Sequence, residues 1–316
     1  MQLTIAVPSH VTYIPDSWDF LLDRAKMYER VGVDGVGVSE HVVFGEHLEA
    51  YASPELGGRA NAVQPTSSDG SFLDPLIALT AISSVTSRIR LQTYILLAAI
   101  RRPTVLAKAA ASLDVLSKGR FDMGVGVGWQ REEYEAAGLE FEGRGELLDH
   151  CLEVCRVLWR EQRASYSSPL LSFENIHMMP KPVDPMGVPV WCSGRPTKRV
   201  AARVAKFATG WFTWDLPPDT IADAVAEMRA MVTAAGGDGD GMLVQAPLDP
   251  VFSSDNVIDV PATLAVVPGL VRTGVTHVNM YRPGLPDDIA HSEEQLTNLV
   301  ASFRDLVGRE PAKVAG

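Results

Sequence analysis

An adjacent carboxylate and imidazole, Glu40 and His41, form the most chemically suggestive pair in the sequence. A histidine titrates near neutral pH, so it can give or take a proton during a reaction. A carboxylate beside it can orient a polar edge of a bound cofactor. The pair directly follows the apolar run 33–39, which reads as a strand. The alternative interpretation is a solvated pair in a surface loop.

A turn of small residues that leads into a predicted helix is the second candidate, and its chemistry is anion binding. Residues 193–198 read Ser-Gly-Arg-Pro-Thr-Lys. The free N–H groups and the dipole of a helix N-terminus favour a phosphate. Arg195 adds positive charge, and Thr197 stands at the expected start of the helix. The alternative is an ordinary loop with basic surface residues.

Three alternating glycines, Gly124, Gly126 and Gly128, end another predicted strand. Their spacing is not the GxGxxG fingerprint of dinucleotide-binding proteins, because Arg131 stands where the third glycine of that pattern would be. Glycine at a strand end indicates that a ligand or a backbone approaches closely. Tight packing inside the protein remains the alternative.

The remaining histidines do not have the spacing of metal ligands. The chain contains no HExxH pattern and no His-x-His on its first strand, which disfavours a metal hydrolase, and we expect no metal site. The histidines other than His41 are His10, His47, His150, His177, His277 and His291.

Strands and helices alternate along the whole chain. Apolar runs predict strands within residues 3–8, 33–39, 89–97, 120–127, 188–192, 210–214, 242–252 and 275–280. Helical spacing predicts helices over 18–31, 74–85, 103–116, 145–159, 197–207, 220–235, 261–272 and 292–306. Eight such units predict a (β/α)8 barrel, with residues 1–316 as one domain. A doubly wound sheet is the alternative, but it would need a nucleotide fingerprint near the first strand.

Two long connections interrupt this pattern. Residues 43–72 form a loop rich in Gly, Ser, Pro and Asn, and residues 163–180 read as an irregular or hairpin excursion. In a barrel, function lies where the strands end and the βα loops begin. We therefore expect the pair at 40–41, the glycines and the 193–198 turn to share one end of the barrel.

Charge and cysteine content exclude several classes of function. The 316 residues carry a net charge of −11, from 28 Lys and Arg against 39 Asp and Glu, which makes nucleic acid or an anionic membrane a poor partner. Cys151, Cys155 and Cys192 are too few and badly spaced for a disulfide framework, and suit the reduced thiols of a cytoplasmic protein. The start of the chain has no signal-peptide pattern, and its longest apolar stretch is far short of the ~20 residues of a membrane helix.

Four segments resemble the luciferase-like family of flavin and deazaflavin oxidoreductases. They are residues 32–41, 103–120, 124–133 and 180–194, and the likeness extends over about residues 3–307. The chain is most similar to the branch that uses the 8-hydroxy-5-deazaflavin coenzyme F-420, while FMN-dependent monooxygenases share the same scaffold. Members of the family are often homodimers.

The resemblance implies roles for single residues around the flavin ring. Glu40 corresponds to an acidic residue near the ring, and His41 to the active-site histidine. The peptide between Tyr94 and Ile95 corresponds to one that is cis in several deazaflavin enzymes and supports the ring from behind. The family pattern also assigns cofactor contacts on the neighbouring strand to Gly126, Gly128 and Glu132.

Further correspondences concern the phosphate and the substrate. Ser193 and Gly194 match a Gly-Gly pair that meets the cofactor phosphate, with serine replacing the first glycine. Trp129 stands where the sugar-phosphate dehydrogenases of the family carry a catalytic carboxylate. The resemblance therefore implies an aromatic wall there, suited to an apolar or planar substrate. The insertions 43–72 and 163–180 match segments that shape substrate entry.

The cofactor decides the reaction that the resemblance implies. A deazaflavin would exchange a hydride with a small organic substrate, with His41 as the proton partner. FMN would instead support insertion of one oxygen atom from O2, with a flavin reductase as a partner. A flavin-binding protein without activity is a further alternative. A cofactor-free lyase or aldolase is disfavoured because no lysine stands at a predicted strand end.

Overall fold

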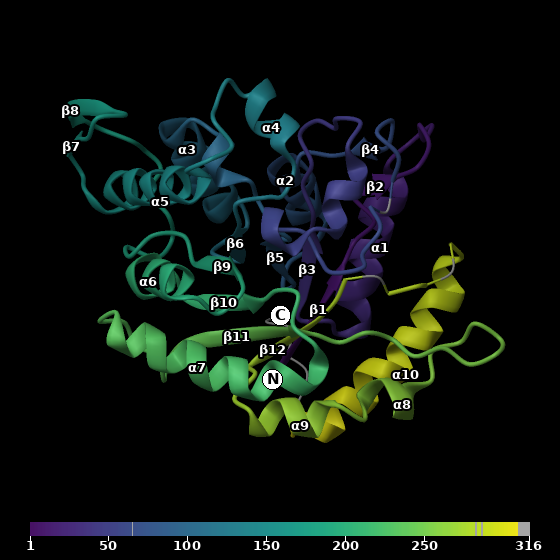
Figure 1. The fold of residues 1–316 in the computed structure, drawn as a ribbon. Helices are drawn as coiled ribbons and strands as arrows, with labels where there is room; N and C mark the ends of the chain where they lie inside the picture. Colours follow the sequence, from purple (N-terminus) through teal and green to yellow (C-terminus); the bar gives the residue numbers. More distant parts are fainter. Residues whose placement is uncertain (65, 282, 286, 309–316) are drawn as a thin grey trace.

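Eight parallel strands close into a barrel in the computed structural model, which describes residues 1–64, 66–281, 283–285 and 287–308 (Figure 1). Their order around the barrel is β1-β12-β11-β10-β9-β6-β5-β3. The strands are β1 (Gln2–Ala6), β3 (Gly35–Val38), β5 (Arg90–Thr93), β6 (Phe121–Val125), β9 (Val190–Gly194), β10 (Gly210–Thr213), β11 (Leu243–Pro247) and β12 (His277–Met280). Each strand overlaps a predicted one, so the (β/α)8 barrel is confirmed. Part of the expected domain, residues 309–316, lies outside the described residues.

Helices surround the ring of strands (Figure 1). They are α1 (Asp19–Val31), α2 (Pro75–Val85), α3 (Pro103–Leu116), α4 (Arg131–Ala136), α5 (Arg144–Arg160), α6 (Lys198–Phe207), α7 (Ile221–Ala234), α8 (Val260–Leu264), α9 (Val267–Arg272) and α10 (Ile289–Val307). The predicted helix 261–272 is divided into α8 and α9. Pro268 explains the division, because proline has no N–H and its ring clashes with the carbonyl four residues earlier. Within the described residues, no helix is both long and apolar enough to span a membrane.

The helices pack on the barrel through apolar faces. In α5, Leu148, Cys151, Leu152, Cys155 and Leu158 are buried, which follows the i, i+3, i+4 spacing of an amphipathic helix. All three cysteines of the chain are buried and free. Cys151 and Cys155 both belong to the buried face of α5, and their thiols are free.

The loop 43–72 lies at the carboxyl ends of the strands, as predicted for a βα connection. It contains short 3-10 helices, η1 (Leu48–Ala52) and η2 (Pro54–Leu56), and ends in β4 (Ser71–Phe72). Strand β4 pairs antiparallel with β2 (His10–Val11). Residue 65 of this loop lies outside the described residues.

The excursion 163–180 contains an antiparallel hairpin, β7 (Ala164–Ser167) and β8 (Ser172–Ile176). It connects helix α5 to strand β9, so it is an αβ connection and emerges at the amino ends of the strands. Figure 1 places it at the margin of the molecule beside α5. It contributes no residue to the cavity described below. The expectation that this segment shapes substrate entry is therefore corrected.

Candidate active site

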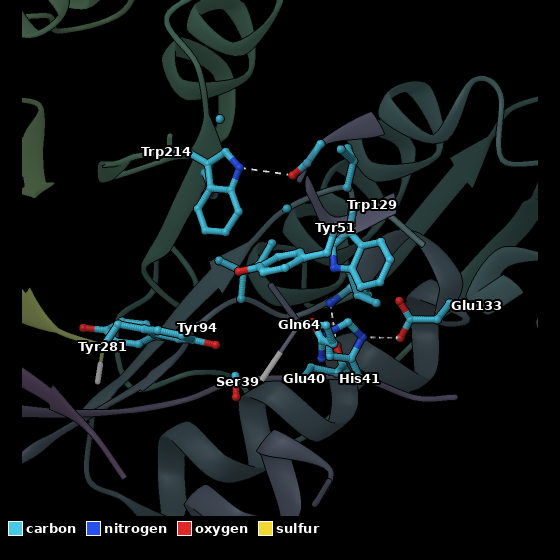
Figure 2. Close-up of a pocket in the computed structure, with 18 of the residues that line it drawn as sticks. Ser39, Glu40, His41, Tyr51, Gln64, Tyr94, Trp129, Glu133, Trp214 and Tyr281 are labelled. Carbon is cyan, nitrogen blue, oxygen red and sulfur yellow. Dashed lines mark hydrogen bonds and ion pairs between the residues drawn. The ribbon is translucent and has the colours of Figure 1, made fainter. Parts of the chain in front are cut away.

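A cavity opens at the carboxyl ends of the strands, where the sequence placed the site (Figure 2). Ten predicted site residues line it, namely Glu40, His41, Tyr94, Ile95, Gly126, Gly128, Trp129, Ser193, Gly194 and Arg195. Two do not, Glu132 and Thr197. Other lining residues were not singled out from the sequence, namely Ser39, Tyr51, Pro54, Gly57, Gln64, Phe72, Leu97, Val127, Glu133, Trp214 and Tyr281.

His41 lies against a buried carboxylate that the sequence reasoning missed. Its Nδ1 is 3.4 Å from Oε1 of Glu133, at ion-pair distance but without hydrogen-bond geometry. The same Oε1 accepts a hydrogen bond from the Val42 N–H at 2.8 Å. Glu133 is buried. The hydrogen bond from Val42, the residue after His41, holds its carboxylate next to the imidazole.

The neighbouring residue, Glu132, points elsewhere. It is on helix α4 next to Gly45, and it is partly exposed. Successive residues of a helix point about 100° apart, so only one of two adjacent glutamates can face the cavity. The family pattern pointed to the wrong one of the pair as a lining residue. Recognising α4 as a helix would have left both glutamates as candidates.

Glu40 is buried and fully engaged by the protein. One carboxylate oxygen accepts a hydrogen bond from the Leu97 N–H at 2.5 Å, and the other pairs with Arg101. Arg101 also binds Asp74 at 2.7 Å. Burial raises the pKa of Glu40, while the guanidinium of Arg101 and the Leu97 N–H favour its ionised form. Glu40 therefore anchors the chain beside His41.

The peptide bond between Tyr94 and Ile95 is cis, as the resemblance implied. The Tyr94 hydroxyl accepts a hydrogen bond from Nε2 of Gln245 at 2.6 Å, so its ring is fixed inside the barrel. Ile95 covers Gly126, where an added Cβ would lie 1.9 Å from its Cδ1. Ile95 thus forms an apolar surface on the cavity wall.

The alternating glycines of β6 are largely explained by packing inside the protein. A Cβ at Gly124 would lie 2.2 Å from the carbonyl oxygen of Thr93, and Gly126 is covered by Ile95. Gly128 has φ +70°, a conformation in which glycine avoids the clash of a side chain. Tight packing, the alternative interpretation of this pattern, accounts for Gly124 and Gly126.

The 193–198 turn leads into α6 as predicted. Thr197 caps the helix by accepting a hydrogen bond from the Val200 N–H at 3.3 Å, which is a structural role outside the cavity. Arg195 lines the cavity and forms an ion pair with Asp215. Gly194 has φ +151°, and its carbonyl accepts a hydrogen bond from Nε1 of Trp211 at 2.8 Å. The turn is therefore held by β10 on one side and by its own helix on the other.

The loop 43–72 covers the cavity and is fastened to the end of β10. Nε1 of Trp214 donates to the carbonyls of Gly57 and Gly58 at 3.1 and 3.2 Å. Asp215 accepts a hydrogen bond from the Ala60 N–H at 3.0 Å. These contacts join two segments more than 150 residues apart in the sequence.

Trp129 forms the aromatic wall that the resemblance implied. Its ring lies 5.3 Å from that of Tyr51 and 5.6 Å from the imidazole of His41. Phe72, at the end of the 43–72 loop, meets the His41 ring edge-on at 5.1 Å. The Phe44 ring is nearer still, at 4.4 Å, so three aromatic rings surround His41, and Glu133 approaches its Nδ1.

The lining of the cavity sets the chemistry that it can support. Among the described residues, no group of three or more His, Cys, Asp or Glu side chains could hold a metal ion. The lining instead offers a histidine for proton transfer, an apolar surface at Ile95 and a helix-opening turn with Arg195.

The chain is similar to several known proteins. An uncharacterized protein of Mycobacterium tuberculosis is 36% identical over 201 residues, covering 61% of this chain and 71% of that protein. Monooxygenase RslO1 from Streptomyces bottropensis shares the fold with a TM-score of 0.74 at 18% identity, covering 96% of this chain and 99% of its own. An F420-dependent secondary alcohol dehydrogenase, solved with an F420-acetone adduct, has the same TM-score and coverage at 16% identity.

A family model assigns the chain. The model described as luciferase-like monooxygenase matches residues 1–257, which include every residue of the candidate site except Tyr281. The chain belongs to the luciferase-like monooxygenase family, whose members are flavin- and deazaflavin-dependent oxidoreductases.

Proposed function

We propose that this protein uses the deazaflavin coenzyme F-420 to transfer a hydride to or from a small organic substrate. One observation carries the proposal. The candidate residues stand at the ends of β3, β5, β6 and β9, which are consecutive strands of the barrel. His41, Ile95, Gly126 and Ser193 therefore follow one another around the rim, as a long ligand with a ring at one end and a phosphate at the other would require.

The residues present fit such a coenzyme. Ile95 offers an apolar surface to a flat ring, and it is backed by Gly126. Ser193, Gly194 and Arg195 would hold a phosphate near the N-terminus of α6, where N–H groups and the helix dipole favour an anion. When bound, a deazaflavin supplies hydride transfer at its C5. The organic chemistry then belongs to the coenzyme, and the barrel supplies position and exclusion of water.

His41 is the residue that would move the proton. Hydride transfer to a carbonyl leaves an oxygen that needs a proton, and transfer from an alcohol releases one. His41 lies on the cavity wall, and the carboxylate of Glu133, 3.4 Å from its Nδ1, orients the imidazole. The rings of Phe72 and Trp129 shield the imidazole from water. His41 is therefore the proposed proton partner, and Glu133 its positioning residue.

An FMN-dependent monooxygenase is the second candidate. It is favoured by the fold shared with RslO1, whose TM-score equals that of the F420-dependent dehydrogenase. This reaction would need a flavin reductase to supply the reduced cofactor. The substrate would again be a small organic molecule in the same cavity.

The phosphate-binding role of the 193–195 turn can be tested by substitution. We expect the double variant Ser193→Ala, Arg195→Ala to bind oxidised F-420 at least about tenfold more weakly, since it loses a charged hydrogen bond to the phosphate. The matched control is Arg199→Ala, which removes an exposed arginine of α6 that does not line the cavity. Fluorescence quenching would measure both affinities. Unchanged affinity in the double variant would show that this turn does not hold the coenzyme.

A further inference from the structure

A polar group inside the cavity has no hydrogen-bond partner among the residues that the structure describes. Gln64, in the 43–72 loop, lines the cavity and is only 9% exposed. Its Nε2 is buried and makes no hydrogen bond to any described residue. An amide donor that is buried without a partner is costly, so such groups nearly always bind something. Figure 2 shows Gln64 among the side chains around the cavity.

A second unpaired nitrogen belongs to the same cavity. Within the described part of the chain, Nδ1 of His41 is also buried without a hydrogen bond, although Glu133 lies near it. Gln64 and His41 come from different parts of the 40–72 segment and both face the one space. Two unpaired polar groups at one cavity are the pattern expected where a ligand presents hydrogen-bonding atoms.

The walls around these two groups are aromatic. Tyr51, Phe72, Trp129 and Trp214 line the same cavity, and we call these four residues the aromatic enclosure. Tyr51 and Trp129 are both buried, and their rings are 5.3 Å apart. Aromatic rings bind flat groups through stacked or edge-on contacts, so this enclosure favours a planar ligand over a flexible chain.

The charges at the cavity favour a neutral ligand. Arg195 belongs to the turn that we assign to the coenzyme phosphate, and Glu40 is paired with Arg101, so neither is left to bind a charged group of the substrate. The remaining lining carboxylate, Glu133, would repel an anion near His41. A carboxylate or phosphate ester would therefore bind poorly beside the enclosure.

We propose that the substrate is a neutral planar ring compound whose carbonyl oxygen accepts a hydrogen bond from Nε2 of Gln64 within the aromatic enclosure. The reaction in this inference rests on the proposed function. The hydrogen bond from Gln64 to the ligand does not, and it can be tested by binding alone. In the reducing direction, the carbonyl carbon would receive a hydride that a bound reduced deazaflavin supplies, and His41 would give a proton to the carbonyl oxygen. The C=O double bond would become a C–OH single bond while the coenzyme is oxidised by two electrons, so atoms and charge would balance.

The test compares two probes that differ only at the carbonyl. 1-Indanone is a planar bicyclic ketone, and indane is the same skeleton without the oxygen. We expect calorimetric titration to show that the wild-type protein binds 1-indanone about tenfold more tightly than indane, as one good hydrogen bond allows. Benzoate, a planar anion, and 2-heptanone, a flexible ketone, should both bind more weakly than 1-indanone.

Substitution of Gln64 decides the role of its amide. Gln64→Leu keeps the size of the side chain and removes the donor, so the preference for 1-indanone over indane should fall to about onefold. Gln162→Leu, at an exposed glutamine outside the cavity, should keep the wild-type preference. Binding of indane itself should be retained in Gln64→Leu, which shows that the cavity is intact.

Outcomes of this test separate the inference from the cofactor assignment. The titrations are made on the protein alone and on the protein saturated with F-420 or FMN. A preference that depends on Gln64 in any of these forms supports the inference, even where F-420 does not bind. A preference that survives Gln64→Leu, tighter binding of benzoate than of 1-indanone, or no binding of either indane compound would overturn it.

Discussion

At the scale of single residues, the histidine and its carboxylate partner are the centre of the site. The sequence indicated His41 from its type and place, because a histidine after a strand of a barrel stands at the functional end. The partner could not be read in the same way. Glu133 reaches His41 only because α4 turns it inward, and sequence spacing does not place two segments about 90 residues apart in contact.

The adjacent glutamates of α4 provide a matched test of this pair. Glu133→Gln should slow single-turnover hydride transfer at least about tenfold, because the imidazole loses the carboxylate that lies 3.4 Å from its Nδ1. Glu132→Gln should change the rate by less than about twofold, since that residue does not line the cavity. The dissociation constant of the coenzyme should stay the same in both variants. Equal rates in the two variants would argue against a role for Glu133.

At the scale of elements, apolar runs were the most dependable signal. Most residues of the barrel strands are buried, as in β1 and β6, because parallel strands are covered on both faces and are rich in apolar residues. Helix boundaries followed from proline and glycine, as for α2, where Asp74 caps the helix and Pro75 opens it. The role of residues 163–180 was misjudged, although their position between a helix and a strand already indicated the end of the barrel away from the site.

Two glycines in different elements should respond in opposite ways to alanine. Gly124→Ala would place a Cβ against the Thr93 carbonyl of the neighbouring strand, which the backbone cannot relieve cheaply, so we expect a loss of about 1–3 kcal/mol of unfolding free energy. Gly269→Ala, in α9, meets no atom within 4 Å and should be neutral or stabilise the helix by up to about 1 kcal/mol. Urea titration would measure both. Equal stability of the two variants would refute this packing account of β6.

At the scale of the whole molecule, the order of strands around the barrel explains why distant segments form one site. The chain visits β3, β5, β6 and β9 in succession, so their loops follow one another around the rim. The long loop 43–72 then closes over them and is fastened to Trp214 after β10. The sequence predicted that the site lies at the carboxyl ends of these strands. It did not predict the contact between Trp214 and the 43–72 loop, because a hydrogen bond from an indole to a backbone carbonyl leaves no pattern in the sequence.

The stability of the whole fold should depend on pH through Glu29, which fastens α1 to the segment before β5. Burial opposes its ionisation, but N–H groups of Ile89, Arg88 and Ser87 outweigh this and hold the pKa of Glu29 below its ordinary value. A carboxyl group with a lowered pKa stabilises the fold above its ordinary titration range, and that contribution is lost as the pH falls through the lowered value.

Replacing Glu29 should therefore cost stability mainly at neutral pH. Glu29→Gln should lower the unfolding free energy at pH 7 by about 1 kcal/mol, allowing for its partial exposure, and the difference should shrink as the pH falls below the ordinary glutamate range of about 4.3. Glu227→Gln, on the exposed side of α7, serves as the control and should change little. Urea unfolding of the three proteins across this pH range would show the effect. A Glu29→Gln loss that is the same at pH 3 and pH 7 would contradict it.

The central claim is the identity of the coenzyme, and one titration addresses it directly. Purified protein is titrated side by side with oxidised F-420 and FMN, with binding followed by fluorescence quenching. The proposed function predicts that F-420 binds at least about tenfold more tightly than FMN, a difference of about 1.4 kcal/mol in binding free energy. Tight binding of FMN alone would contradict the deazaflavin assignment and indicate a monooxygenase supplied by a reductase.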